Sequence, residues 1–250
     1  MTYKCPACGA EKTEPIPKKT YAPGEDPAQK AKDGTPTGAG ASEACADKAI
    51  RSSASDEGPK GTKYGLLSLR SVKQGKTSII LTWNKNSKAV RYAVYGNLCG
   101  KNNKMKLLSK SVKTNSFSVR KINKALAKGK YYKFIVVALD ENNNVVSTSK
   151  VAHVATKGGK VGNHKSVTTK AKKNKVTVKK GKTFKLAGKA VAKSKKLKVV
   201  KHRAIKYETS NAKTATVSSK GVIKGKAKGS CYIYAYAQNG VYKKIKVLVK

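Results

Sequence analysis

The sequence predicts an all-β protein in which two tandem β-sandwiches follow a largely disordered N-terminal linker. Three observations predict this class: the apolar residues come in short alternating runs, aromatic residues make up only 6% of the 250 residues, and glycine occurs 21 times. Alternation with a period of two is typical of strands that bury one face. A chain of this length can form two domains that each bury a core. No run approaches the roughly 18 apolar residues of a membrane span.

Residues 1–17 contain one Cys-x-x-Cys pair, Cys5 and Cys8. A zinc ribbon needs a second pair of ligands at suitable spacing. The next cysteine is Cys45 and the first histidine is His153, so we expect a weak half-site and no metal centre. With the glycine that follows it, the pair resembles the end of a Cys-x-x-Cys-Gly repeat found between domains of large surface proteins of Gram-positive anaerobes.

The N-terminus does not have the pattern of a signal peptide, because Met1 is followed by polar residues and then by Cys5 and a proline instead of an apolar core. The rest of the chain has the composition of an exported protein. We therefore expect the sequence to be the C-terminal fragment of a longer extracellular or cell-surface protein.

Residues 18–62 are rich in Pro, Gly, Ala and Ser and in paired charges. Such a segment cannot bury enough apolar surface to fold alone, so it is predicted to be a flexible linker. One short helix is expected inside it, from Glu43 to Arg51 with Ser42 as its N-cap, because acidic residues lie in its first half. This helix either packs on the first sandwich or forms transiently.

Residues 63–156 are predicted to form the first sandwich, with seven short strands. The clearest strands are expected at 79–83, 92–95, 116–119, 131–139 and 145–154. The only tryptophan, Trp83, lies in the second strand, where a sandwich core takes one large anchor.

The segment 126–138 resembles the fibronectin type III pattern of a leucine, a glycine turn, a tyrosine and then alternating apolar residues. Lys128 stands where that family usually has proline, which weakens the turn. The resemblance implies that Tyr132 is the tyrosine-corner residue and that Tyr92 and Val94 are core residues. It carries a fold and no function of its own.

Residues 157–175 are expected to be a joint, because Gly158-Gly159 interrupts the pattern, and residues 176–250 are expected to form the second sandwich. The expected strands lie at 175–179, 183–186, 205–207 and 242–249, with three more inside 207–237 that we expect to form one sheet. The run 193–202 is predicted to be a basic loop or an exposed strand.

Turn residues, small residues and alternation within 207–237 together resemble the bacterial Ig-like domain of group 2. The residues that carry the resemblance are Tyr207, Thr209, Ser210, Asn211, Ala215, Val217, Gly221, Val222, Ile223, Gly225 and Gly229. The resemblance covers roughly the last third of the chain. It implies extracellular display and a role in adhesion or spacing instead of catalysis.

The strand after Gly229 alternates strictly. Its core face is expected to carry Cys231, Ile233, Ala235 and Ala237, and its outer face Tyr232, Tyr234 and Tyr236. With Lys244 and Lys246 from the last strand, these tyrosines are the predicted ligand-binding set, because such rows stack on sugar rings or form protein interfaces. The alternative is cross-strand Tyr and Lys packing that stabilises a solvent-facing sheet.

The net charge of +44 is concentrated in the two expected sandwiches. Residues 1–60 hold nine basic and nine acidic residues, whereas residues 61–250 hold 47 basic residues against Asp140, Glu141 and Glu208. Only five of the 56 basic residues are arginine, the residue that reads bases and grips phosphate bidentately. The lysine coat favours diffuse attraction to polyanions over specific nucleic-acid reading. Lysines also keep exposed sheet edges unpaired.

Residues that carry catalysis are scarce in 63–250. The three histidines, His153, His164 and His202, lie in strand-end or loop contexts with no acidic neighbour in the sequence. No GxSxG, HExxH or glycine-rich phosphate loop occurs. We therefore expect no catalytic residue, no cofactor and no enzyme activity. No disulfide framework is expected either, because the two cysteines of this range fall one in each sandwich.

Together these expectations describe a non-catalytic adhesion or presentation module of a bacterial surface or secreted protein. The expected partners are an anionic cell-wall polymer, an acidic glycan or another surface protein, with no specific nucleic acid and no transmembrane segment. The alternative is that the two sandwiches are C-terminal accessory domains of a secreted enzyme, such as a glycan hydrolase, whose catalytic part is absent from this chain. The sequence leaves the ligand and the oligomeric state open.

Overall fold

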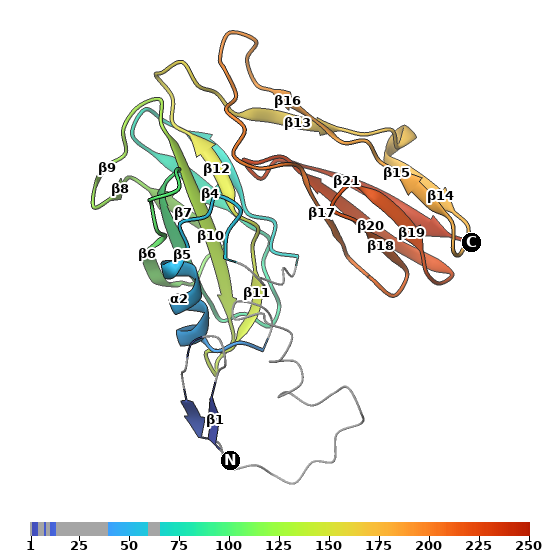
Figure 1. The fold of residues 1–250 in the computed structure, drawn as a ribbon, viewed down its shortest axis with the longest axis horizontal. Helices are drawn as coiled ribbons and strands as arrows, with labels where there is room; N and C mark the ends of the chain where they lie inside the picture. The colour runs from blue at the N-terminus through green and yellow to red at the C-terminus, as the bar shows by residue number, and fades with distance from the viewer. Residues whose placement is uncertain (1, 5–7, 9–10, 14–39, 60–65) are drawn as a thin grey trace.

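The computed structural model describes residues 2–4, 8, 11–13, 40–59 and 66–250. Within these residues the chain forms two β-domains and one α-helix, with the C-terminus at the far end of the second domain (Figure 1). Near the N-terminus, β1 (Thr2–Lys4) pairs with β2 (Glu11–Thr13) in a two-stranded antiparallel ribbon. Cys5 and most of the predicted linker lie outside the described residues. No helix in the described part is long and apolar enough to cross a membrane.

The first domain is a β-sandwich whose two sheets share one core. One sheet has the order β3-β4-β7, and the other has the order β11-β10-β5-β6 with β12 also paired to β10. The strands are β3 (Arg70–Gln74), β4 (Ile79–Thr82), β5 (Arg91–Leu98), β6 (Lys106–Val112), β7 (Ser116–Val119), β8 (Lys121–Ile122), β9 (Lys124–Ala125), β10 (Tyr131–Leu139), β11 (Val145–Thr148) and β12 (Ala152–Ala155).

The predicted core residues of this domain are confirmed. Trp83, Tyr92 and Val94 are buried in one cluster, with the Trp83 and Tyr92 rings edge to face at 5.4 Å. The Tyr132 hydroxyl accepts a hydrogen bond of 2.8 Å from the Ala127 backbone N–H, which is the geometry of a tyrosine corner. The predicted return strand 145–154 is two strands, β11 and β12, which both pair with β10.

The central strand β10 is buried along all nine of its residues. Its even-numbered residues, such as Phe134 and Val136, face the sandwich core. Ile135 and Val137 face the opposite way and pack with Ala46 and Ile50 of helix α2 (Glu43–Ser52). The helix thus covers a second apolar face of the sheet, which is why β10 shows no polar alternation.

Helix α2 confirms the helix predicted in the linker, including its cap, because the Ser42 hydroxyl accepts a hydrogen bond of 3.2 Å from the Cys45 N–H. The Arg91 guanidinium holds the Glu43 carboxylate at 2.7 Å. Of the two alternatives for this helix, the structure shows the packed one. This segment packs on the first domain because its helix has an apolar stripe that the exposed face of β10 and β5 buries.

The second domain is a smaller sandwich. Its larger sheet has the order β14-β21-β20-β17, and the facing sheet has the order β15-β19-β18. A third pair, β13 with β16, lies toward the first domain (Figure 1). The strands are β13 (His164–Thr168), β14 (Lys175–Val178), β15 (Thr183–Lys185), β16 (Lys189–Ala192), β17 (Lys206–Thr209), β18 (Ala215–Val217), β19 (Val222–Gly225), β20 (Gly229–Tyr236) and β21 (Tyr242–Val249).

Two predictions for this domain were wrong. The stretch 207–237 does not form one sheet: β17 and β20 belong to the larger sheet, and β18 and β19 cross to the facing sheet. The expected joint also contains a strand of the domain, since β13 pairs with β16. Both differences follow from long-range pairing, which the local period-two pattern does not specify.

Candidate functional site

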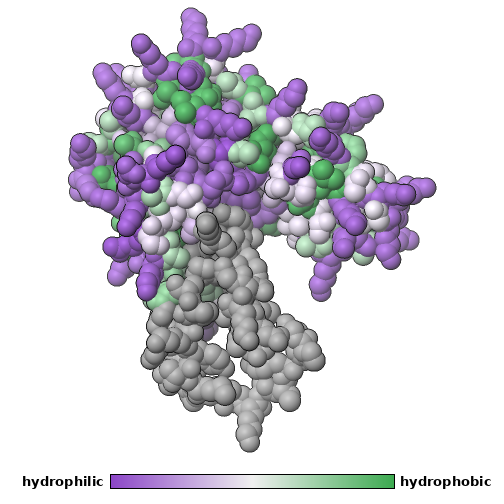
Figure 2. Space-filling view, in the orientation of Figure 1, coloured by the Kyte–Doolittle hydropathy of each residue, from purple (hydrophilic) through white to green (hydrophobic). Residues whose placement is uncertain are grey.

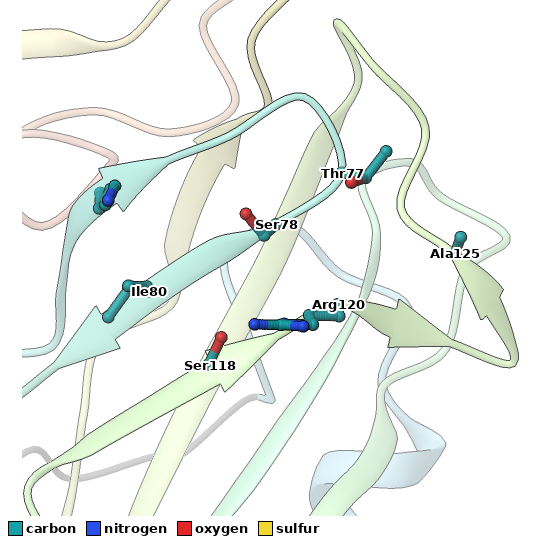
Figure 3. Close-up of a pocket in the computed structure, with 7 residues that line it drawn as sticks. Thr77, Ser78, Ile80, Ser118, Arg120 and Ala125 are labelled. Atoms are coloured by element: carbon teal, nitrogen blue, oxygen red, sulfur yellow. The ribbon is translucent and has the colours of Figure 1, made fainter.

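A shallow hollow of about 450 Å³ lies on the outer face of the first domain's β3-β4-β7 sheet (Figure 3). Lys73, Ile80 and Ser118 lie side by side across the three strands of this sheet, because Lys73 pairs with Ile80 and Ile80 pairs with Ser118. The other lining residues are Thr77, Ser78, Arg120 and Ala125.

The lining of this hollow combines positive charge with hydroxyl groups. Lys73 and Arg120 are exposed, and Figure 3 shows the Arg120 side chain running alongside Ser118 toward Ile80. A guanidinium group binds carboxylate, phosphate or sulfate oxygens bidentately, and hydroxyl groups both donate and accept hydrogen bonds. The hollow therefore fits an anionic, hydroxylated unit such as an acidic sugar or a phosphodiester.

The second domain has a basic hollow of its own, of about 390 Å³. Its lining includes His164, Lys189, Lys201, Arg203 and Lys220, with the apolar side chains of neighbouring residues between them. No carboxylate lines it. Like the hollow on the first domain, it offers cations to an anionic ligand.

Basic residues far outnumber acidic ones in the two domains. Figure 2 shows hydrophilic side chains projecting from both domains, with only small apolar patches between them. Because residues 61–250 carry 47 basic and three acidic residues, their field is positive over both domains.

The predicted tyrosine row is only partly exposed. Tyr232 is 38% exposed, whereas Tyr236 is 2% exposed, so the expectation of three outward tyrosines at a free surface was wrong for Tyr236. The alternation itself is confirmed, because Cys231 and Ile233 lie in the core. Tyr234 lies between the two extremes, half-buried and stacked on Tyr236 at 6.1 Å.

The predicted lysines do lie beside the row. Tyr232 pairs across the strands with Lys246, and Tyr234 pairs with Lys244. The Lys244 ammonium lies 3.9 Å from the centroid of the Tyr232 ring, which is a cation–π contact. This packing is the cross-strand arrangement that was the alternative to binding; ligand binding by this face stays a prediction.

Tyr236 is buried because it lies in the junction between the two domains. Its hydroxyl lies 2.9 Å from the Ser68 hydroxyl of the first domain and donates to the Glu208 carboxylate at 3.1 Å. Lys150 of the first domain bonds the same carboxylate at 3.0 Å. Burial raises the pKa of Tyr236 and of Glu208 and lowers the pKa of Lys150, while the ion pair opposes the shifts of Glu208 and Lys150.

Backbone groups extend this junction. Arg203 donates to the carbonyl of Val151 at 2.8 Å and to that of Ala237 at 3.0 Å. The Gln238 carbonyl accepts the His153 N–H at 2.7 Å. Hydrogen bonds from buried groups to fixed backbone partners define one relative orientation of the two domains.

The three histidines also lie at or near the junction, and the fold gives His202 an acidic partner that the sequence around it does not contain. Its Nδ1 lies 3.0 Å from an Asp56 carboxylate oxygen, although the two residues are far apart in sequence.

Asp56, Lys133 and Lys150 were not predicted as junction residues, because no local spacing in the sequence marks a contact between two domains. The sequence offered one sign of such a contact: Lys133 lies inside the otherwise apolar run that forms β10.

The chain was compared with known families, curated proteins and solved structures. No curated protein matches the chain. The solved structures that resemble it include the FN5 domain of Drosophila Lar (24% identity, TM-score 0.29, 36% of this chain and 92% of that chain). They also include the fibronectin type III domain of human fibronectin type III domain containing protein 3 (19% identity, TM-score 0.31, 39% of this chain and 90% of that chain). A third is an Fn3-like protein from Clostridium thermocellum (17% identity, TM-score 0.30, 36% of this chain and 90% of that chain).

The second domain gives a family match. Residues 163–248 match the family model of the bacterial Ig-like domain (group 2), a domain that occurs in surface or extracellular bacterial proteins. This range begins one residue before β13 and ends inside β21, so it spans the described strands of the second domain. The C-terminal part of the chain, over residues 163–248, is thus similar to the bacterial Ig-like domains of group 2.

Proposed function

We propose that this chain is a non-catalytic binding module of a bacterial surface or secreted protein, and that it holds anionic polymers such as wall polymers or acidic glycans. The observation that carries the proposal is the charge distribution: 47 basic and three acidic residues in 61–250. A polyanion that lies across such a surface releases condensed counterions, which drives binding without a specific sequence of units.

The hollow on the first domain supplies the most specific contact. Lys73 and Arg120 there would hold a phosphate, sulfate or carboxylate group, while the hydroxyls of Thr77, Ser78 and Ser118 would meet sugar hydroxyls. The exposed Tyr232, with Lys244 and Lys246, is the second expected contact, where a sugar ring stacks on the aromatic face.

Two double variants with equal charge change test this proposal. Lys73→Ser with Arg120→Ser removes both cations of the hollow, whereas Lys85→Ser with Lys88→Ser removes two exposed cations from another loop. Binding of wall teichoic acid and of a sulfated glycan is measured by calorimetry. Hydrogen bonds to charged groups contribute about 1.5–3 kcal/mol, so the first variant should lose about tenfold or more in affinity and the second much less.

Equal losses in the two variants would show that the hollow has no special role. Absence of wild-type binding to every anionic polymer, at low salt and at millimolar concentration, would reject the proposed function itself.

A further inference from the structure

Three metal-ligating side chains from separate segments converge beside the domain junction. They are Asp56, which follows α2, Cys99, which follows β5, and His153 in β12. One ligand atom of each lies within 4.8 Å of the others. The ligands of a tetrahedral ion lie about 2.0–2.3 Å from the metal, so small side-chain rotations suffice to bring these three atoms around one ion.

His153 is the residue that a packed core does not explain. It is 0% exposed, and neither of its ring nitrogens has a partner with regular hydrogen-bond geometry; the backbone of Asp56 lies within hydrogen-bonding reach of the ring. A buried polar atom without a full hydrogen-bond partner destabilises the fold. A neutral imidazole offers one nitrogen lone pair to a metal ion.

Neighbouring groups hold the Asp56 carboxylate in place. The Lys133 ammonium lies 3.1 Å from one oxygen, and His202 Nδ1 lies 3.0 Å from the other. Lys133 is itself fully buried and also donates to the carbonyl of Gly100. Partners of this kind fix the orientation of a ligating side chain.

The same three side-chain types also occur in cysteine nucleophile sites, but the geometry here does not favour one. Neither of the two hollows described above is lined by Cys99 or His153.

We propose that Asp56, Cys99 and His153 form a binding site for a borderline transition-metal dication, for which Zn²⁺ is the probe. Sulfur and imidazole ligands select such an ion over Ca²⁺ or Mg²⁺. Binding exchanges the Cys99 proton for the metal and releases it to solvent, with no change of oxidation state. A water molecule completes the four-coordinate shell.

The site lies where the N-terminal segment and the two domains meet. Asp56 comes from the N-terminal segment, Cys99 and His153 come from the first domain, and His202 reaches the carboxylate from the second domain. The two histidine rings stack at 5.3 Å with an interplanar angle of 4°. Metal binding therefore stabilises the folded N-terminal segment and the junction together.

The test titrates the full-length chain with Co²⁺ and then with Zn²⁺, in a Cys5→Ser, Cys8→Ser background that removes the other candidate thiols near the N-terminus. One equivalent of Co²⁺ should give a thiolate-to-cobalt charge-transfer band, which Zn²⁺ abolishes by displacement. Zn²⁺ should also raise Tm. Cys99→Ser should remove the band, whereas Cys231→Ser, which changes a thiol buried in the second domain, should keep it.

If Cys99→Ser fails to fold, two further variants still test the site. Asp56→Asn changes a ligand whose side chain is 23% exposed, and His202→Asn removes a partner of that ligand, which should weaken metal affinity by about 10–100-fold. A band that survives Cys99→Ser, or Zn²⁺ affinity unchanged in both Asp56→Asn and His202→Asn, would overturn the proposal, as would the absence of any band in the background protein.

Discussion

At the scale of single residues, side chains with one polar atom in the right place fix the fold locally. Tyr132 is the clearest example, because its ring fills the sandwich core while its hydroxyl accepts from the Ala127 N–H. His164 is the opposite case, since its ring is half-buried and its Nδ1 has no hydrogen-bond partner. A substitution at either residue therefore tests the role of a single polar group, the Tyr132 hydroxyl or the His164 ring.

Tyr132→Phe removes the corner hydrogen bond and leaves the Ala127 N–H without that acceptor. The variant should lose about 0.5–1.5 kcal/mol in the free energy of unfolding, measured by urea denaturation. The matched control is Tyr232→Phe, which removes a hydroxyl from a ring that is 38% exposed. A loss of equal size in both variants would contradict the role of the corner.

His164 predicts a dependence of stability on pH. Burial, and next the charge of Arg203, lower the pKa of His164 below its usual value. A lowered folded-state pKa gives stability that is present above the unfolded-state pKa of about 6.5 and is lost as pH falls through the folded-state pKa. His164→Asn should therefore flatten part of the fall in unfolding free energy below about pH 6.5. A pH profile parallel to that of the wild type would refute this assignment.

At the scale of elements, the chain uses its connecting segments as structural parts. Helix α2 covers the second face of β10, and the hairpin between β20 and β21 carries Gln238, Asn239 and Gly240, all buried, against the first domain. The Asn239 carbonyl accepts the Ser71 N–H at 3.3 Å. The hairpin turn thus acts as an extension of the junction.

Gly240 tests the importance of this turn. A Cβ atom there would lie 2.0 Å from the Leu69 carbonyl oxygen, and the residue has φ of +85°. Gly181 has a similar φ of +78° but nothing within 4 Å of its Cβ position. Both Gly→Ala variants should lose about 1–2 kcal/mol from left-handed backbone strain, and Gly240→Ala should lose more.

Small-angle scattering and hydrogen exchange separate the two effects in these variants. Gly240→Ala should increase the radius of gyration and the exchange of the His153 amide, which donates across the junction. Gly181→Ala should leave both unchanged. Identical behaviour of the two variants would mean that the turn does not hold the domains together.

At the scale of the whole molecule, the sequence was informative wherever structure is local. The strand at 131–139, the Ser42 cap and the inward face of Cys231 follow from period and capping chemistry, and the Tyr132 corner follows from the resemblance to the fibronectin type III pattern. The pairing of β18 with β19 in a separate sheet, the burial of Tyr236 and the meeting of Asp56 with His153 depend on contacts between distant segments. A single sequence carries no periodic signal for such contacts.

The same distinction applies to the candidate binding surface. Lys244 and Lys246 lie beside Tyr232 as the alternation required. The hollow around Lys73 and Arg120 forms where three strands and a hairpin meet on one sheet face. No sequence motif predicts this hollow, because its residues come from separate segments. The excess of positive charge is visible in the composition alone, and the fold distributes it over both domains.

The most direct test of the account is the salt dependence of polymer binding by the wild-type chain. The affinity for wall teichoic acid is measured between about 50 and 200 mM salt, with a neutral glycan as control. Log K should fall linearly and steeply with log salt concentration, and the neutral glycan should bind far more weakly. Affinity that is independent of salt, or equal for the neutral glycan, would contradict it.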